Sequence, residues 1–207
     1  FGISLSSMPL SVGGQDTPEG MREKIKQAIE RKDTVGGVFE VVARGVPVGL
    51  GSYVQPDRRL DARLGQAFMA IPVVKGFEVG LGFGYAEQFG SQVHDPIYHK
   101  KGKGYYRQTN NAGGIEGGIS NGEDIVVRAC MKPICTLMNP LDSVHIKTKN
   151  PSKANTERSD VSVVEAAGVV GGAACAYVLA DAFLEKFGTD ALADIRSAYK
   201  QYRKRVC

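Results

Sequence analysis

The chain has 207 residues, 43% of them apolar and 23% charged, and its formal net charge is +4. This length is enough for one domain with a hydrophobic core, and we treat residues 1–207 as a single domain. The composition is that of an ordinary soluble protein. The modest positive charge suits a small anionic ligand and is too weak to indicate a nucleic-acid partner.

Composition also argues against a membrane protein and a metalloprotein. The most apolar run, residues 166–180, is shorter than the ~20 residues that span a bilayer, so we expect a buried core helix and no membrane partner. The cysteines show no metal-ligand spacing, and a chain of this size does not need a disulfide framework. We therefore expect a cytoplasmic protein without a metal, in which the cysteines are reduced thiols: Cys130, Cys135, Cys175 and Cys207.

Residues 1–16 are apolar without a period, so no element is predicted there. Thr17-Pro18-Glu19 then combines an N-cap residue, a proline at the first helical position and an early acid. It predicts a helix that ends before a turn over residues 33–37. A strand is predicted over residues 38–44, and residues 48–54 are predicted to be its partner strand.

Apolar residues three or four apart predict a second helix, with Leu60, Leu64, Ala67 and Phe68 on one face. A short strand is predicted over residues 76–83. The polar, basic segment 90–104 is predicted to be a flexible loop. Two more strands are predicted over residues 124–131 and 143–147.

The last part of the chain reads as two helices. Ser162 and Glu165 have the spacing of a capping box, which predicts a long helix that runs to Phe187 and is closed by Gly188. Thr189 is predicted to cap a final amphipathic helix. Because strands and helices do not strictly alternate along the chain, we predict an α+β fold.

The densest cluster of glycines lies in residues 109–122, which include Gly113-Gly114, Gly117-Gly118 and Gly122. Glycine lets the backbone bend sharply and lets another group approach closely. The predicted strand that follows delivers Lys132 and Thr136, so the pattern suggests a cradle for an anionic cofactor or substrate. A tight hairpin with exposed glycines explains the same pattern, and no established nucleotide-loop motif is present.

Arg158 and Asp160 precede the predicted long helix. In an extended segment, residues i and i+2 project the same way, here beside a helix N-terminus that favours anions. The two residues could form an acid/base and anion-holding pair. The alternative is a local salt bridge, which is common at protein surfaces. His94, followed by Asp95, could be a base with its orienting carboxylate, although a polar loop explains the pair as well.

Several segments, in this order, resemble the chorismate synthase family. The resemblance runs from about residue 10 to about residue 190, and its segments are 33–37 (Asp-Thr-Val-Gly-Gly), 45–51, 57–62, 71–78, 90–95, 109–122, 132–136 and 158–160. It implies a β-α-β sandwich of antiparallel sheets packed on long helices, of which this chain supplies one half. It also implies a homotetramer for the full-length protein.

The resemblance implies a lyase of the shikimate pathway, in aromatic amino acid biosynthesis. The implied reaction is the anti-1,4 elimination of phosphate from 5-enolpyruvylshikimate 3-phosphate, which gives chorismate. It uses reduced FMN without net redox change, and the family is also associated with NADP.

The resemblance also implies site residues. The expected FMN contacts are Pro72, Val73, Gly117, Lys132, Pro133, Ile134, Cys135, Thr136 and Arg158. Asp160 is implied in proton handling near the flavin, and Arg158 and Asp160 are expected to contact the substrate. Cys135 stands where the family usually has proline, and Val73 where alanine is common; neither change removes a reacting group.

The resemblance covers only the C-terminal part of the family pattern. The N-terminal portion, with its histidines and most of its phosphate-binding arginines, has no counterpart here. We therefore expect a truncated chain that does not turn over substrate alone. Three hypotheses stay open: a lyase, a flavin-binding module without turnover, and a structural remnant without a ligand.

Overall fold

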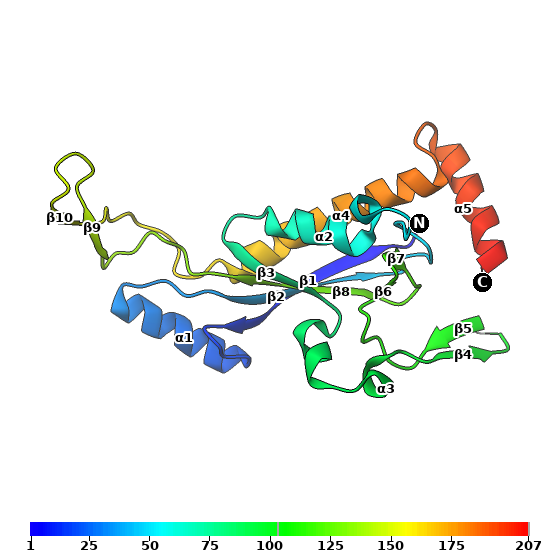
Figure 1. Ribbon diagram of the computed structural model, residues 1–207, viewed down its shortest axis with the longest axis horizontal. Coiled ribbons are helices and arrows are strands. Elements are labelled where there is room, and N and C mark those ends of the chain that lie inside the picture. The colour runs from blue at the N-terminus through cyan, green and yellow to red at the C-terminus, as the bar shows by residue number, and fades with distance from the viewer. Residues whose placement is uncertain (103, 207) are drawn as a thin grey trace.

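The computed structural model describes residues 1–102 and 104–206, so the predicted thiol of Cys207 lies outside the described residues. At its centre is an antiparallel sheet in the order β1-β2-β8-β3 (Figure 1). Its strands are β1 (Ser4–Val12), β2 (Gly37–Arg44), β8 (Ile125–Met131) and β3 (Val74–Val79). Antiparallel strands packed on helices confirm the predicted α+β class.

One face of the sheet forms the hydrophobic core. Alternate residues of the two central strands are buried, as a half-covered sheet requires: Phe39, Val41 and Ala43 on β2, and Ile125, Val127, Ala129 and Met131 on β8. Helices α2 (Leu60–Met69) and α4 (Val164–Phe187) cover this face (Figure 1). The opposite face is mixed: Arg128 there pairs with Glu40 and Glu78, and the paired Val42 and Val126 lie on the same face.

The long helix α4 packs across β1, β2 and α2. Within the described residues it is the one helix long and apolar enough to cross a membrane, with a mean hydropathy of 1.7. Only its length and composition suggest a membrane span. A core helix meets the same criteria. Its outer side exposes apolar residues, among them Val169, Val170 and Tyr177.

Helix α1 (Pro18–Arg31) begins where the sequence predicts. Thr17 is its N-cap, and the Thr17 hydroxyl accepts a hydrogen bond from the amide of Gly20 at 3.1 Å. At the other end of the chain, α5 (Leu192–Val206) packs on the end of α4 through aromatic rings, with Tyr199 lying 5.3 Å from Phe183 and 5.3 Å from Phe187.

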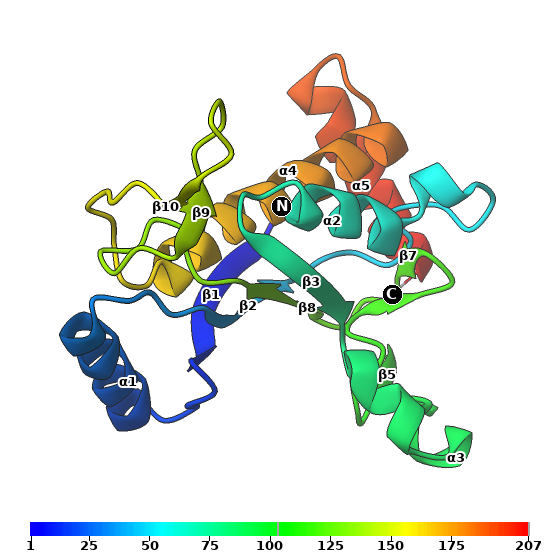
Figure 2. The same ribbon diagram turned by 60° about the vertical axis from the view of Figure 1, so that its left-hand side comes forward.

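Three hairpins extend from this body. The first pairs β4 (Ile97–Lys100) with β5 (Gly104–Arg107), the second β6 (Ile115–Glu116) with β7 (Ile119–Ser120), and the third β9 (Asp142–Val144) with β10 (Pro151–Lys153). The β4–β5 and β9–β10 hairpins project at opposite ends of the molecule (Figures 1 and 2). Short helical segments complete the fold: η1 (Pro56–Arg58), η2 (Gly82–Glu87) and α3 (Gly90–Val93).

Several local predictions are wrong. Residues 48–54 form no strand, because Gly49 and Gly51 have positive φ values of 84° and 92° that break an extended run. Strand β1 lies within the segment where no element was predicted, and the predicted loop over residues 90–104 contains α3 and β4. Helix α4 has Val163 rather than Ser162 at its N-cap, without a side-chain capping bond.

Candidate functional site

Two predicted contact segments meet where β8 ends. The amide of Lys132 donates a hydrogen bond of 2.9 Å to the carbonyl of Val73. The bond continues the pairing of β3 with β8 by one step beyond Met131. Val73 therefore lies directly beside Lys132, and Pro72 precedes it in the chain.

A third predicted segment, Arg158–Asp160, precedes α4 and contacts the end of the Lys132–Thr136 segment. The hydroxyl of Ser159 donates a hydrogen bond of 2.9 Å to the carbonyl of Thr136. Ser159 is half-buried, whereas Arg158 and Asp160 on either side are exposed. This alternation is the one expected of an extended segment, and among the described residues no salt bridge joins Arg158 to Asp160. The salt-bridge alternative is therefore not seen.

In the described part of the chain, two positively charged side chains at this end of the sheet are not neutralised by a carboxylate. Within residues 1–102 and 104–206, neither Lys132 nor Arg158 has a carboxylate partner, and both are exposed. The hydroxyl oxygen of Thr136 is buried and, among the described residues, lacks a hydrogen-bond partner. Buried polar groups normally have a partner, so the unpaired Thr136 hydroxyl, in a segment that begins with Lys132 and is bonded to the residue after Arg158, is a group that a ligand could satisfy.

The backbone is strained at the same place. Val73 has a φ of 65°, in the left-handed region that β-branched residues rarely adopt. Such a conformation costs of order 1–3 kcal/mol and persists only where its surroundings fix it. The hydrogen bond from Lys132 is one such constraint. Strained residues cluster at functional sites, which agrees with Val73 as a predicted contact.

Gly117 lies elsewhere. It stands in the turn between β6 and β7, near the start of β8, whereas Lys132 follows the other end of that strand (Figure 1). The seven residues of β8 separate the two by about 20 Å at ~3.3 Å per residue. The prediction that the glycine-rich segment and Lys132 form one cradle is therefore wrong for a single chain. Gly117 is exposed, with a φ of 60°, and a Cβ atom added to it would meet no atom within 4 Å.

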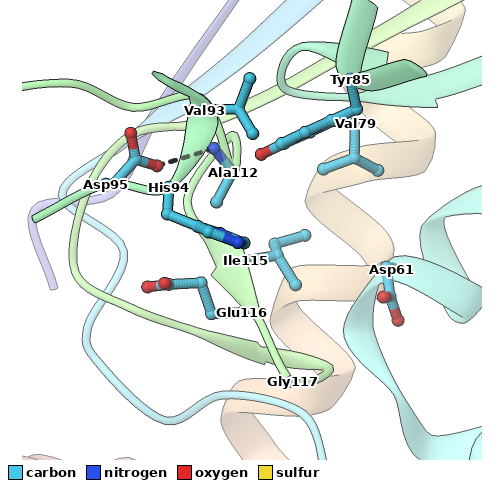
Figure 3. Close-up of a pocket in the computed structure, with 10 residues that line it drawn as sticks. All are labelled: Asp61, Val79, Tyr85, Val93, His94, Asp95, Ala112, Ile115, Glu116 and Gly117. Atoms are coloured by element: carbon cyan, nitrogen blue, oxygen red, sulfur yellow. Dashed lines mark hydrogen bonds between the residues drawn. The ribbon is translucent and has the colours of Figure 1, made fainter. Parts of the chain in front are cut away.

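Gly117 instead borders a cavity of about 380 Å³ (Figure 3). Tyr85 and His94 also line it, together with three carboxylates: Asp61, Asp95 and Glu116. Burial raises the pKa of Tyr85, and the charges of Asp95 and Glu116 raise it further. A cavity whose carboxylates outnumber its cations does not favour a phosphate. The cationic end of the sheet is therefore the better candidate for an anion site.

Asp95 has a structural role. Its carboxylate accepts hydrogen bonds from the Thr109 hydroxyl at 2.6 Å and from the amides of Asn111 and Ala112 at 2.9 and 2.8 Å. Burial opposes ionisation, but these hydrogen bonds outweigh it and hold the pKa of Asp95 below its usual value. Among the described residues no hydrogen bond joins Asp95 to His94. The two do not form the base and orienting carboxylate considered from the sequence.

Residue-by-residue reasoning missed one contributor to the cationic end. The hydroxyl of Thr34 donates a hydrogen bond of 2.6 Å to the carbonyl of Ile134, although the two residues are 100 positions apart. Thr34 lies in the turn that precedes β2. The signal available was its motif, Asp33-Thr34-Val35-Gly36-Gly37, which belongs to the family resemblance.

Comparisons with known proteins agree with this resemblance. A family model described as chorismate synthase matches residues 3–184. The chorismate synthase of Caldanaerobacter subterraneus subsp. tengcongensis is 54% identical over 200 residues, which are 97% of this chain and 57% of that protein. The enzyme of Geobacter sulfurreducens is 55% identical over 198 residues, covering 92% of this chain and 50% of that protein.

A solved structure supports the same relationship. A crystal structure of chorismate synthase matches 99% of this chain and 64% of its own, with a TM-score of 0.83 and 39% sequence identity. The chain thus spans about half the length of the curated relatives it matches. Because the family model covers most of the chain and the relatives share more than half of its residues, the chain belongs to the chorismate synthase family.

Proposed function

We propose that this chain carries part of the active site of a chorismate synthase. The reaction is the anti-1,4 elimination of phosphate from 5-enolpyruvylshikimate 3-phosphate, which breaks a C–O bond and removes a ring proton to give chorismate. We place it in the shikimate pathway, in the cytoplasm. One observation carries the proposal: the segments at Val73, Lys132–Thr136 and Arg158 meet at one end of the sheet, with two free cations.

The residues at this end fit reduced FMN. Lys132 and Arg158 would balance the negative charge of its phosphate, and the unpaired Thr136 hydroxyl would supply a hydrogen bond. Pro72 and Val73, with Pro133, Ile134 and Cys135, would line the ring with backbone and small side chains. When bound, reduced FMN supplies transient electron density to the elimination. We assign no role in the reaction to NADP.

Asp160 and Arg158 act on the substrate in this proposal. The Asp160 carboxylate is exposed, so it can accept a proton at one of its oxygens. Arg158 projects beside it and can hold an anionic group of the substrate. Ser159 fixes the segment between them through its bond to Thr136. The adjacent N-terminus of α4 has no side-chain cap, so its amides add a favourable field for anions.

The position of Gly117 bears on assembly. Because a strand length separates it from Lys132, we infer that Gly117 contributes to the flavin site of a second copy in the proposed homotetramer. A mixing experiment tests this inference. We expect Lys132→Ala and Gly117→Trp chains to be defective separately and to regain flavin sites when mixed, since one shared site then has both native residues. A mixture with no recovery would exclude Gly117 from the flavin site.

Flavin binding tests the site itself. We expect Lys132→Ala and Arg158→Ala each to weaken binding of reduced FMN about tenfold or more, measured by anaerobic titration, because each removes a charge-assisted contact. Lys26→Ala is the matched control: Lys26 is an exposed lysine on α1, and its loss should leave affinity unchanged. Equal affinities for all three variants would contradict the proposed site.

Turnover tests the chemistry. We expect Asp160→Asn in the full-length protein to keep FMN affinity and to lower kcat by about 100-fold, the scale of a general acid–base contribution. A variant with unchanged kcat would remove Asp160 from the reaction.

The second candidate function is flavin binding without turnover. The observation in its favour is the length of the chain, which spans 57% of one relative and 50% of another. Under this alternative the chain binds FMN, Lys132→Ala weakens that binding, and no chorismate forms from the substrate under any flavin concentration. The chorismate assay on this chain separates the two candidates.

A further inference from the structure

We propose that Thr34 and Ser159 are positioning residues, which together fix the Lys132–Thr136 segment for its ligand. The proposal rests on the proposed function for the identity of that ligand, reduced FMN. Neither hydroxyl donates its hydrogen bond to the ligand, because each donates it to a backbone carbonyl of the segment. They bind it at two points, Ile134 and Thr136.

The first point of attachment comes from the turn before β2. Thr34 donates to the Ile134 carbonyl at 2.6 Å, and the Thr34 amide is itself held by the Asp33 carboxylate at 2.7 Å. The hydrogen bond from Thr34 joins two residues that are 100 positions apart, and it ends in the segment that holds the predicted flavin contacts.

The same turn touches the site at two further places. A Cβ atom on Gly36 would lie 2.3 Å from the Met131 carbonyl oxygen and 2.9 Å from the Pro133 nitrogen, so backbone packs directly on backbone there. The amide of Val35 donates a hydrogen bond of 2.8 Å to the carbonyl of Val161, one residue after Asp160. The turn thus contacts both segments that the flavin site combines.

The second point of attachment closes the arrangement. Ser159 donates to Thr136 at 2.9 Å and so connects the Arg158–Asp160 segment to the end of Lys132–Thr136. With Thr34, it leaves the segment little freedom to move relative to Arg158. A preorganised site loses less ordering entropy on binding, so these two hydrogen bonds raise affinity without touching the ligand.

Two readouts on the full-length protein test the proposal. Thr34→Val and Ser159→Ala should each weaken binding of reduced FMN about three- to tenfold, the range expected for one hydrogen bond. Thr34→Ser and Ser159→Thr, which keep the hydroxyl, should restore most of that affinity. Amide hydrogen exchange at Lys132 and Val35, whose amides donate to the carbonyls of Val73 and Val161, should accelerate in the first two variants and not in the conservative pair.

Thr17→Val is the matched control for lost stability. Thr17 caps α1 with the same kind of hydroxyl bond, away from the site, so its variant should lose stability and keep FMN affinity and the exchange rates of Lys132 and Val35. Native affinity in Thr34→Val and Ser159→Ala, or loss in the conservative variants as well, overturns the proposal. Faster exchange in a protein that binds no FMN at all would instead support the positioning role and overturn the proposed function.

Discussion

Gly36 packs against Met131 so closely that a Cβ atom on Gly36 would come within 2.3 Å of the Met131 carbonyl oxygen. The neighbouring atom is backbone, which cannot rotate away. We expect Gly36→Ala to lower the free energy of unfolding by about 2 kcal/mol, as overpacking does, and to displace the start of the Lys132–Thr136 segment. Urea denaturation measures the first effect and FMN titration the second.

Gly76→Ala is the control for this prediction. Gly76 lies in β3, on the far side of β8, and its Cβ would stand 3.4 Å from that of Cys130, an ordinary contact. We expect this variant to keep stability to within about 0.5 kcal/mol. A Gly36→Ala protein as stable as Gly76→Ala would show that the turn does not press on the end of β8.

Two adjacent glycines of α4 should respond in opposite ways to alanine. A Cβ on Gly171 would lie 2.6 Å from the buried ring of Phe39, whereas one on Gly172 meets no atom within 4 Å. We expect Gly171→Ala to destabilise the fold by about 1–3 kcal/mol and Gly172→Ala to stabilise it by up to about 1 kcal/mol, since alanine favours the helix. Thermal unfolding of the two variants measures the difference, and a shift of the same sign in both would contradict this packing of α4.

The Asp95 carboxylate should make stability depend on acid pH. Burial opposes its ionisation, but hydrogen bonds donated by Thr109, Ala112 and Asn111 hold the pKa of Asp95 below the usual value of a carboxyl in the folded chain. A lowered pKa stabilises the fold above the unfolded-state value and ceases to do so as the pH falls through the folded-state value. We expect Asp95→Asn to cost about 1–2 kcal/mol near pH 7 and progressively less below about pH 4. A difference between variant and parent that stays constant from pH 7 to pH 3 would refute it.

Local signals in the sequence were sufficient where one short motif decides the structure. Thr17-Pro18 set the start of α1, and Gly188 marked the end of α4. The same reasoning was wrong for residues 48–54, where glycine conformations override apolar propensity. It was wrong again at Ser162, because a capping-box spacing does not ensure that the hydroxyl faces the helix. Strand β1 was missed because its burial alternates but its apolar residues do not follow that alternation, since Ser7 packs on Gly168 of α4 and Met8 is exposed.

The candidate site shows where such reasoning ends. Lys132 and Arg158 were selected as charged residues beside a strand end and a helix start, and the structure places their segments together. Thr34 was marked only by the family motif that contains it, because a single hydroxyl bonded to a carbonyl 100 residues away has no periodicity. To infer that Gly117 lies far from Lys132, one needs the length and register of β8, because a strand prediction alone does not give a distance.

Thiol reactivity offers a test that reports on core and site together. Burial raises the pKa of Cys175 to about 12, so its thiolate is nearly absent near pH 8 and the thiol is also inaccessible. Cys130 and Cys135 are exposed. In a Cys207→Ser protein, which removes the remaining cysteine, we expect a thiol reagent to label Cys130 and Cys135 in the native state and Cys175 only after unfolding.

The flavin adds a second comparison within the same experiment. Cys135 lies in the segment proposed to bind reduced FMN, whereas Cys130 is exposed on the face of β8 opposite the core. We expect saturating reduced FMN to slow labelling of Cys135 at least about tenfold, as most of the protein is then ligand-bound, and to leave Cys130 unchanged. Mass spectrometry of the labelled peptides gives both rates at once. Equal protection of the two cysteines would indicate a global change in stability, and protection of neither would place the flavin away from Lys132–Thr136.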